Sequence, residues 1–272
     1  MKNIFILASL LLFSSNLFAT EKIEEVEQFE IRSYGPQKVG VNDLVFEARI
    51  DNLTEILSKN TALGKLVDVS FKIFWLSPSQ YKIEVNGLPK GYTDIRNDLS
   101  MLIKGKLEFV LPEKFMEKFK AYTLTAEPVA DGKLIKAIDT TYNMAVPEVD
   151  ILFDKSGVLK TVETKAANVK SEFFHSPKSW SNNKLVLDKV IMRSQQGLVK
   201  QSSTSEIQYV SVNGVGFPSK LTIKNVSEMV VPANGKNKEK KVKNETGTVI
   251  RFSNYEVNTG KAAKALADTS KH

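Results

Sequence analysis

The feature that most constrains this chain is a long succession of strand-like segments in its second half. Between Leu124 and Tyr255 apolar and polar residues alternate in segments at roughly 8–12-residue spacing, and turn residues such as Asp131-Gly132 and Asn213-Gly214 separate them. Strands joined by such short turns pair antiparallel, whereas parallel strands need a crossover of about a dozen residues or more. The pattern therefore predicts an antiparallel meander and argues against a nucleotide-binding α/β fold.

An earlier hairpin is predicted between Val67 and Asn86-Gly87. Apolar residues alternate with polar ones up to Trp75, Ser77-Pro78-Ser79 interrupts the pattern, and alternation resumes at Tyr81. Such spacing is typical of two strands that share one apolar face. The alternating apolar residues of this hairpin are Val67, Val69, Phe71, Ile73, Trp75, Tyr81, Ile83 and Val85.

Two helices are expected between this hairpin and the meander, over Thr93–Ile103 and Glu113–Tyr122, where apolar residues recur with helical spacing. The peptide Leu107–Leu111 between them fits either a short strand or an extended link. The predicted fold class is therefore mainly β (α+β), with ten or more strands. A sheet of that size must curl to bury one face, so we expect a curved antiparallel sheet or incomplete barrel with the helices on its concave side.

The ends of the chain differ in composition from its middle. Residues 1–19 combine Lys2, an apolar run from Ile4 to Phe13 and a final Ala19, which is typical of a signal peptide cleaved after Ala19. An uncleaved membrane anchor is the alternative. Residues 20–40 are expected to form a lightly packed lead, residues 41–257 the domain, and residues 258–272 a disordered tail.

Composition argues against most catalytic sites. The 272 residues include no Cys and only two His, of which His272 is the last residue and His175 follows two phenylalanines, a setting typical of a packed or surface histidine. A cysteine nucleophile or thiolate metal site is excluded, and a catalytic triad or zinc site is disfavoured. We therefore expect a non-enzymatic protein without metal or cofactor, and a cysteine-free exported chain suits the bacterial periplasm.

Positive charge is concentrated in the segment Gly235–Glu245. The chain carries a formal net charge of +7, but the aromatic platforms that accompany nucleic-acid binding are missing beside these lysines, so no nucleic acid is expected as a partner. The segment is interpreted either as a solvated hairpin tip or as a contact for an anionic surface. The lysines of that predicted contact are Lys236, Lys238, Lys240, Lys241 and Lys243.

Three segments resemble the LolA/LolB-like fold of periplasmic lipoprotein carriers. They are FKIFWLSPSQYKIEV at Phe71–Val85, ILFDKSGVLKTVE at Ile151–Glu163, and FPSKL at Phe217–Leu221. The resemblance implies an open half-barrel of about eleven strands, closed by two or three helices, whose apolar cavity holds acyl chains. The chain departs from the family at Ser77, where the carriers often have an arginine, and in its added basic segment.

From this resemblance we expect a periplasmic carrier or sensor, monomeric, that binds lipid or lipoprotein acyl chains and meets membrane proteins of the cell envelope. The alternative is a structural or protein-interaction module with a filled core and no lipid cargo. The first hypothesis assigns lipid binding to the hairpin face and to one helix. Its residues are Val69, Phe71, Ile73, Trp75, Tyr81, Ile83, Val85, Phe115, Met116 and Phe119.

Overall fold

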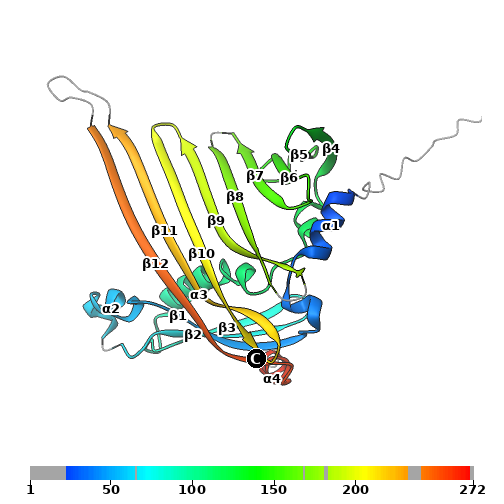
Figure 1. The fold of residues 1–272 in the computed structure, drawn as a ribbon. Helices are drawn as coiled ribbons and strands as arrows, with labels where there is room; N and C mark the ends of the chain where they lie inside the picture. Colours follow the sequence, from blue (N-terminus) through cyan, green and yellow to red (C-terminus); the bar gives the residue numbers. More distant parts are fainter. Residues whose placement is uncertain (1–22, 65, 168, 181–182, 232–239, 270–272) are drawn as a thin grey trace, which may run out of the picture.

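A computed structural model describes residues 23–64, 66–167, 169–180, 183–231 and 240–269. The fold is mainly β, as predicted, and is built on one open antiparallel sheet of 12 strands in the order β3-β2-β1-β12-β11-β10-β9-β8-β7-β6-β5-β4 (Figure 1). The strands are β1 (Asp43–Ile50), β2 (Ser70–Leu76), β3 (Gln80–Asn86), β4 (Thr123–Val129), β5 (Gly132–Ile138), β6 (Glu148–Asp154), β7 (Leu159–Ala166), β8 (Val169–Ser179), β9 (Leu185–Gln196), β10 (Val199–Val212), β11 (Val215–Val231) and β12 (Lys240–Val257).

Helical elements precede the sheet, interrupt it and follow it. The α-helices are α1 (Glu24–Arg32), α2 (Leu53–Ser58), α3 (Thr93–Lys104) and α4 (Lys261–Thr269), and the 3-10 turns are η1 (Pro36–Val39), η2 (Thr61–Leu63), η3 (Leu107–Phe109) and η4 (Phe115–Phe119). The prediction of a helix from Thr93 is confirmed by α3.

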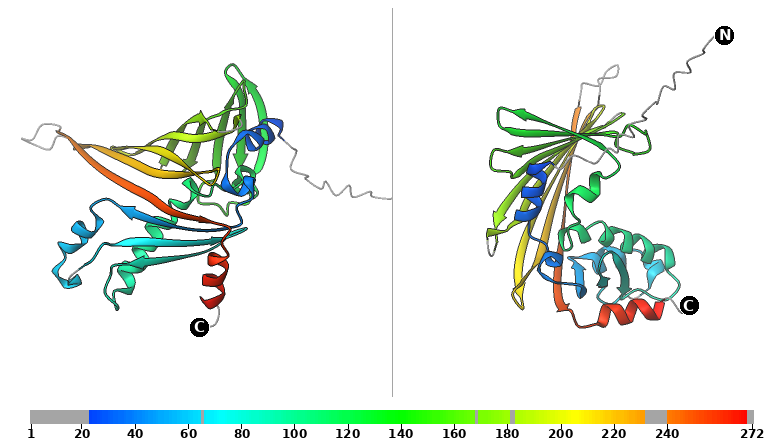
Figure 2. Two further views of the ribbon diagram at one scale, coloured as in Figure 1. Left: turned by 60° about the horizontal axis from the view of Figure 1, so that its bottom comes forward. Right: turned by 90° about the vertical axis from the view of Figure 1, so that its right-hand side faces the viewer.

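The sheet bends between its short first strands and its long last ones. In Figure 2, β1–β3 fold back beneath the long strands β8–β12. Strand β1 joins the two parts, since Leu44–Ile50 pairs with Ile250–Val257 of β12 on one side and Asp43–Ala48 pairs with Phe71–Leu76 of β2 on the other. The first and last parts of the domain are therefore neighbours, although some 200 residues separate them in the sequence.

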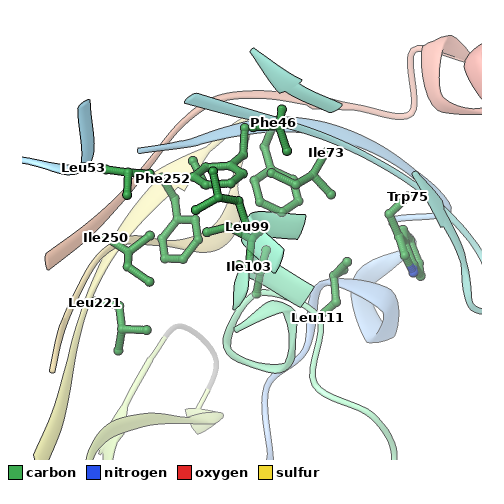
Figure 3. Packing of buried hydrophobic residues seen from close by; sticks show 14 of the residues in the cluster. Phe46, Leu53, Ile73, Trp75, Leu99, Ile103, Leu111, Leu221, Ile250 and Phe252 are labelled. Atoms are coloured by element: carbon green, nitrogen blue, oxygen red, sulfur yellow. The ribbon is translucent and has the colours of Figure 1, made fainter. Parts of the chain in front are cut away.

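The larger hydrophobic core fills the bend. Side chains of α3 insert between β1–β2 and β11–β12, with Leu99 and Ile103 lying among Phe46, Ile73 and Ile250 (Figure 3). Ile103, Phe46, Ile73 and Ile250 have no exposed surface. The face of the sheet that carries Ile250 and Leu221 is called the inner face below.

A second core lies on the same inner face, at the other end of the sheet. Ile135 of β5, Ile151 and Phe153 of β6, and Phe119 of η4 pack with Val26 of α1. Phe29 of α1 makes an edge contact with Phe153, at 5.6 Å between ring centroids. The two cores are separate clusters linked by the inner faces of β7–β10.

Both ends of the domain are more ordered than the sequence indicated. The expected lightly packed lead contains α1, which buries Val26 in the second core. The expected disordered tail contains α4, which packs through Ala262 against Val45 and Phe74 on the outer face of β1–β2. Both predictions are wrong for these residues. Each helix carries a short apolar stripe, which is a weak signal in the sequence but covers sheet surface that would otherwise be exposed.

Residue Asp43 fixes the start of α4. Its Oδ2 atom accepts the backbone N–H of Ala263 at 2.9 Å, and its backbone oxygen accepts the N–H of Asn258 at 2.7 Å. The Asn258 side chain in turn accepts the N–H groups of Asn42 and Asp43. A carboxylate at a helix N-terminus satisfies an unpaired backbone donor and complements the helix dipole, so Asp43 ties α4 to the sheet.

Two other sequence expectations are corrected locally. The predicted helix Glu113–Tyr122 is only the 3-10 turn η4, and Leu107–Leu111 contains the 3-10 turn η3 rather than a strand. Strand β2 begins at Ser70, so Val67 lies outside it and is exposed. The predicted signal peptide lies outside the described residues. Within the described part of the chain, no helix is long and apolar enough to cross a membrane.

Candidate functional site

A cavity of about 510 Å³ lies on the inner face, between the two cores. This volume falls in the range of roughly 300–1,000 Å³ typical of small-ligand sites. Its walls come from α1 and η1, from the η3–η4 segment, and from β7–β11. Apolar wall residues include Phe29, Tyr34, Pro36, Phe109, Val110, Pro112, Phe115, Phe119, Leu159, Val162, Phe173, Pro177, Leu185, Val186, Leu187, Val190, Met192, Tyr209 and Pro218.

The floor of the cavity follows from the register of the central strands. Val162 pairs with Phe173, and Phe173 pairs with Met192, so these three side chains form one row across β7–β9. Val190 stands two residues further along β9 on the same face. All four side chains are only partly buried, because the helices that cover the two cores leave this part of the sheet uncovered.

The opposite wall is the segment from α1 to η1. Phe29 contacts Phe115 at 5.3 Å between ring centroids, and Glu30 accepts the backbone N–H of Phe115. Further along, the Tyr34 hydroxyl accepts the N–H of Gly216 at 2.6 Å. The segment is therefore held to η4 at one end and to β11 at the other, across the cavity.

Charged residues around the cavity are largely paired with each other. Lys118 and Glu108 form an ion pair at 3.3 Å, and Lys38 and Glu30 form another at 3.1 Å. Such partly exposed pairs contribute little to stability. They add charged groups to a lining that is otherwise largely apolar.

His175 is the titratable group of the cavity floor. It lies on β8 opposite Val190, and its Nδ1 atom is buried without a hydrogen-bond partner among the described residues. The pKa of His175 is lowered to about 4, chiefly by burial; a hydrogen bond with the backbone of Phe173 and the carboxylate of Glu108 oppose the shift, and the cation of Lys118 adds to it. The imidazole is therefore neutral at pH 7, and it presents an unused polar atom rather than a charge.

A band of polar side chains crosses the inner face above the cavity. Cross-strand pairing places its six members side by side on six consecutive strands. We call this band the polar row; it consists of Thr164, Ser171, Ser194, Gln201, Ser227 and Asn244. Ser203 and Ser205, which line the cavity, lie between the polar row and the larger core.

The structure divides the residues predicted to bind lipid between a core and the cavity. Phe115 and Phe119 line the cavity, and Met116 packs against the second core. Ile83 packs against the larger core, and Tyr81 is 39% exposed on the edge strand β3. The other five fill the larger core, away from the cavity, as the filled-core alternative expected for this face: Val69, Phe71, Ile73, Trp75 and Val85.

The physical reason for this placement is α3. Its residues Leu99 and Ile103 pack against the apolar face of β1–β3, so that Val69, Phe71, Ile73, Trp75 and Val85 there are buried. The cavity instead lies where no helix packs directly against the apolar faces of β7–β9. Val162, Phe173, Val190 and Met192 are apolar strand residues like those of the cores, and the path of the chain above them distinguishes them.

The predicted anionic-surface contact is described in part. Lys236 and Lys238 lie outside the described residues. Lys240, Lys241 and Lys243 are exposed at the start of β12, and Lys243 forms an ion pair with Glu245 at 2.6 Å.

The groups that line the cavity are suited to holding a ligand. In the described part of the chain no group of three or more His, Cys, Asp or Glu residues is placed to hold a metal ion. The cavity combines apolar walls with hydroxyl groups, one neutral imidazole and paired charges. These groups can bury an apolar chain and hydrogen-bond a polar end.

Comparison with known proteins adds little to this description. No family model matches the chain, and no curated protein shows significant similarity to it. A solved structure described as the crystal structure of MucB in complex with MucA(peri) aligns with 89% of this chain and 94% of its own, at 10% identity and a TM-score of 0.16. Similarity this weak carries no argument about function.

Proposed function

We propose that this protein is a non-enzymatic binding protein of the cell envelope that holds an acyl chain of a lipid or lipoprotein in the cavity between its two cores. The observation that carries the proposal is the cavity itself: about 510 Å³, with a largely apolar lining that includes a few hydroxyl groups, one imidazole and paired charges. The fold-level resemblance found in the sequence agrees with this ligand class.

The energetics favour such a ligand over a small polar one. Burying a methylene group is worth about 0.8 kcal/mol, so a chain of ten methylenes could gain roughly 8 kcal/mol without any specific polar contact. A small polar ligand would find few partners on the floor, where Val162, Phe173 and Met192 present only carbon and sulfur atoms.

We also propose that the protein acts outside the cytoplasm. The support is the charged, apolar and small-residue pattern of residues 1–19. Mass determination of the chain recovered from the periplasm of a bacterial host tests this: a mass beginning at Thr20 supports export, and a chain retaining residues 1–19 contradicts cleavage.

The binding proposal is tested by filling the floor. In the double variant Val190→Trp/Met192→Trp, two indoles occupy the cavity; in the matched control Lys189→Trp/Ile191→Trp, the same strand carries them on its outer face. Binding of the fluorescent fatty acid cis-parinaric acid is measured for the wild type and both variants.

We expect the inner-face variant to bind at least roughly tenfold more weakly than the wild type, a loss of about 1.4 kcal/mol or more, and the control to bind as the wild type does. Native mass spectrometry shows whether lipid co-purifies. A wild-type chain that carries no lipid and takes up no probe would support the filled-core alternative, and equal losses in both variants would place binding elsewhere.

A further inference from the structure

Exposed apolar side chains gather at the tips of the longest hairpins. Leu198, in the turn between β9 and β10, is 56% exposed, Met229 of β11 is 43% exposed and Val242 of β12 is 39% exposed. Val199 pairs with Met229, and Met229 pairs with Val242, so these side chains form a continuous strip across three strands. We call Leu198, Val199, Met229 and Val242 the tip strip.

Lysines lie next to the tip strip along the strands. Because side chains alternate between the two faces of the sheet, Lys200, Lys241 and Lys243 point to the outer face, and Lys240 shares the face of the tip strip. One residue further from the tip than Met229, Glu228 pairs with Lys200 on one side and with Lys243 on the other. Lys241 pairs with Val230, and Lys240 is the first residue of β12. Glu228 and Glu245 are the acidic residues at these positions. The four lysines Lys200, Lys240, Lys241 and Lys243 therefore outnumber two glutamates, which leaves the tip with a positive excess.

The tip lies apart from the rest of the domain. Beyond the polar row the strands β10–β12 extend away from both cores, and Figure 1 shows their tips at the end of the molecule opposite α4. No described helix covers the tip strip, and its exposed side chains do not form part of either core. Exposed apolar residues grouped in this way mark an interaction surface.

We infer that the tips of β9–β12 dock on an anionic lipid surface, with the tip strip inserted among the headgroups and the flanking lysines paired with lipid phosphates. Lysine clusters beside shallow apolar insertions suit such a surface, because both attractions act at the same depth. The positive excess selects anionic over zwitterionic lipid. This inference goes beyond the proposed function and does not depend on the cavity.

Vesicle co-sedimentation of the whole mature chain tests the inference. Vesicles of phosphatidylcholine alone are compared with vesicles containing phosphatidylglycerol. We expect binding to the second kind only, and we expect it to weaken as salt is raised. Binding that is equal for both vesicles, or absent from both, overturns the inference.

Two pairs of variants locate the contact. Met229→Glu/Val242→Glu should abolish binding, whereas Val210→Glu, which alters a 40% exposed residue near the other end of β10, should leave it unchanged.

Lys240→Gln/Lys241→Gln/Lys243→Gln should weaken binding on the order of 100-fold. The control Lys59→Gln/Lys90→Gln/Lys120→Gln removes the same charge from exposed positions elsewhere and should change binding little. Equal effects of variant and control in either pair overturn the assigned surface.

A reporter variant keeps the test independent of folding. Leu198→Trp places an indole in an exposed turn, where the substitution disturbs no core contact. On anionic vesicles its emission should shift to shorter wavelength, and brominated lipid should quench it; the parent emission of Trp75 and Trp180 is subtracted. An unshifted, unquenched indole on a chain that still binds vesicles excludes insertion of the tip.

Discussion

Between pH 7 and pH 4.5, acid should destabilise this protein through protonation of His175. Its pKa is lowered to about 4 in the folded chain, chiefly by burial, whereas an unfolded histidine has a pKa of about 6.5. The unfolded chain therefore binds the proton more tightly. Well above pH 6.5 the imidazole is neutral in both states and has no effect; as pH falls through 6.5 towards 4, the free energy of unfolding falls.

The magnitude follows from the two pKa values. Linkage gives a loss of about 1.4 kcal/mol at pH 5.5 and about 2.5 kcal/mol at pH 4.5, approaching about 3.4 kcal/mol at lower pH. Lys118, which adds to the shift, and Glu108, which opposes it, are the charged groups that contribute. The other histidine, His272, is present in both the wild type and the variant compared below, so its contribution to the difference in unfolding free energy cancels.

The perturbation is His175→Gln, which keeps a polar side chain but does not titrate. Urea unfolding of the wild type and the variant at pH 7.5, 6.5, 5.5 and 4.5 yields the difference in unfolding free energy at each pH. We expect this difference to move in the variant's favour by the amounts above as pH falls. A difference that stays constant over this range would refute the buried, neutral state of His175.

Two further predictions concern the cores. Ile103→Ala leaves a cavity between Phe46 and Ile73 and should lower the free energy of unfolding by about 2–5 kcal/mol, measured by urea unfolding; a loss under about 1 kcal/mol would mean that α3 does not fill the bend. Asp43→Ala removes the acceptor for the Ala263 N–H and should cost about 1–2 kcal/mol, with faster hydrogen exchange confined to α4, while Asp43→Asn keeps an acceptor and should lose less. Unchanged exchange in the alanine variant would show that α4 is held without this contact.

The sheet could be predicted from the sequence because its signal is local. Alternation identifies each strand, and turn residues show that consecutive strands pair. For example, the predicted turn at Asp131-Gly132 joins β4 to β5, where Val129 pairs with Gly132. Helical segments with few apolar residues gave weaker signals. Helix α4 packs mainly through Ala262, and the helical spacing of Phe115 and Phe119 yields only a 3-10 turn against Phe29.

The position of the cavity could not be predicted, because nothing local distinguishes a covered apolar strand face from an uncovered one. Phe71 and Phe173 are both apolar residues in the middle of a strand, yet α3 covers the first and the second borders the cavity. The difference depends on where the η3–η4 segment runs after α3, which is a property of the whole fold. Sequence reasoning therefore chose the most apolar strand face, and that face is the one the fold fills.

The polar row limits the length of acyl chain that the binding site can accommodate favourably. From Val190 to Ser194 the strand advances four residues, or roughly 13 Å, and there hydrocarbon would displace water from hydroxyl and amide groups without replacing their hydrogen bonds. A guest lying along β9 gains from each added carbon until it reaches this boundary and then stops gaining. Such a site would select acyl chains by their length, independently of the head group.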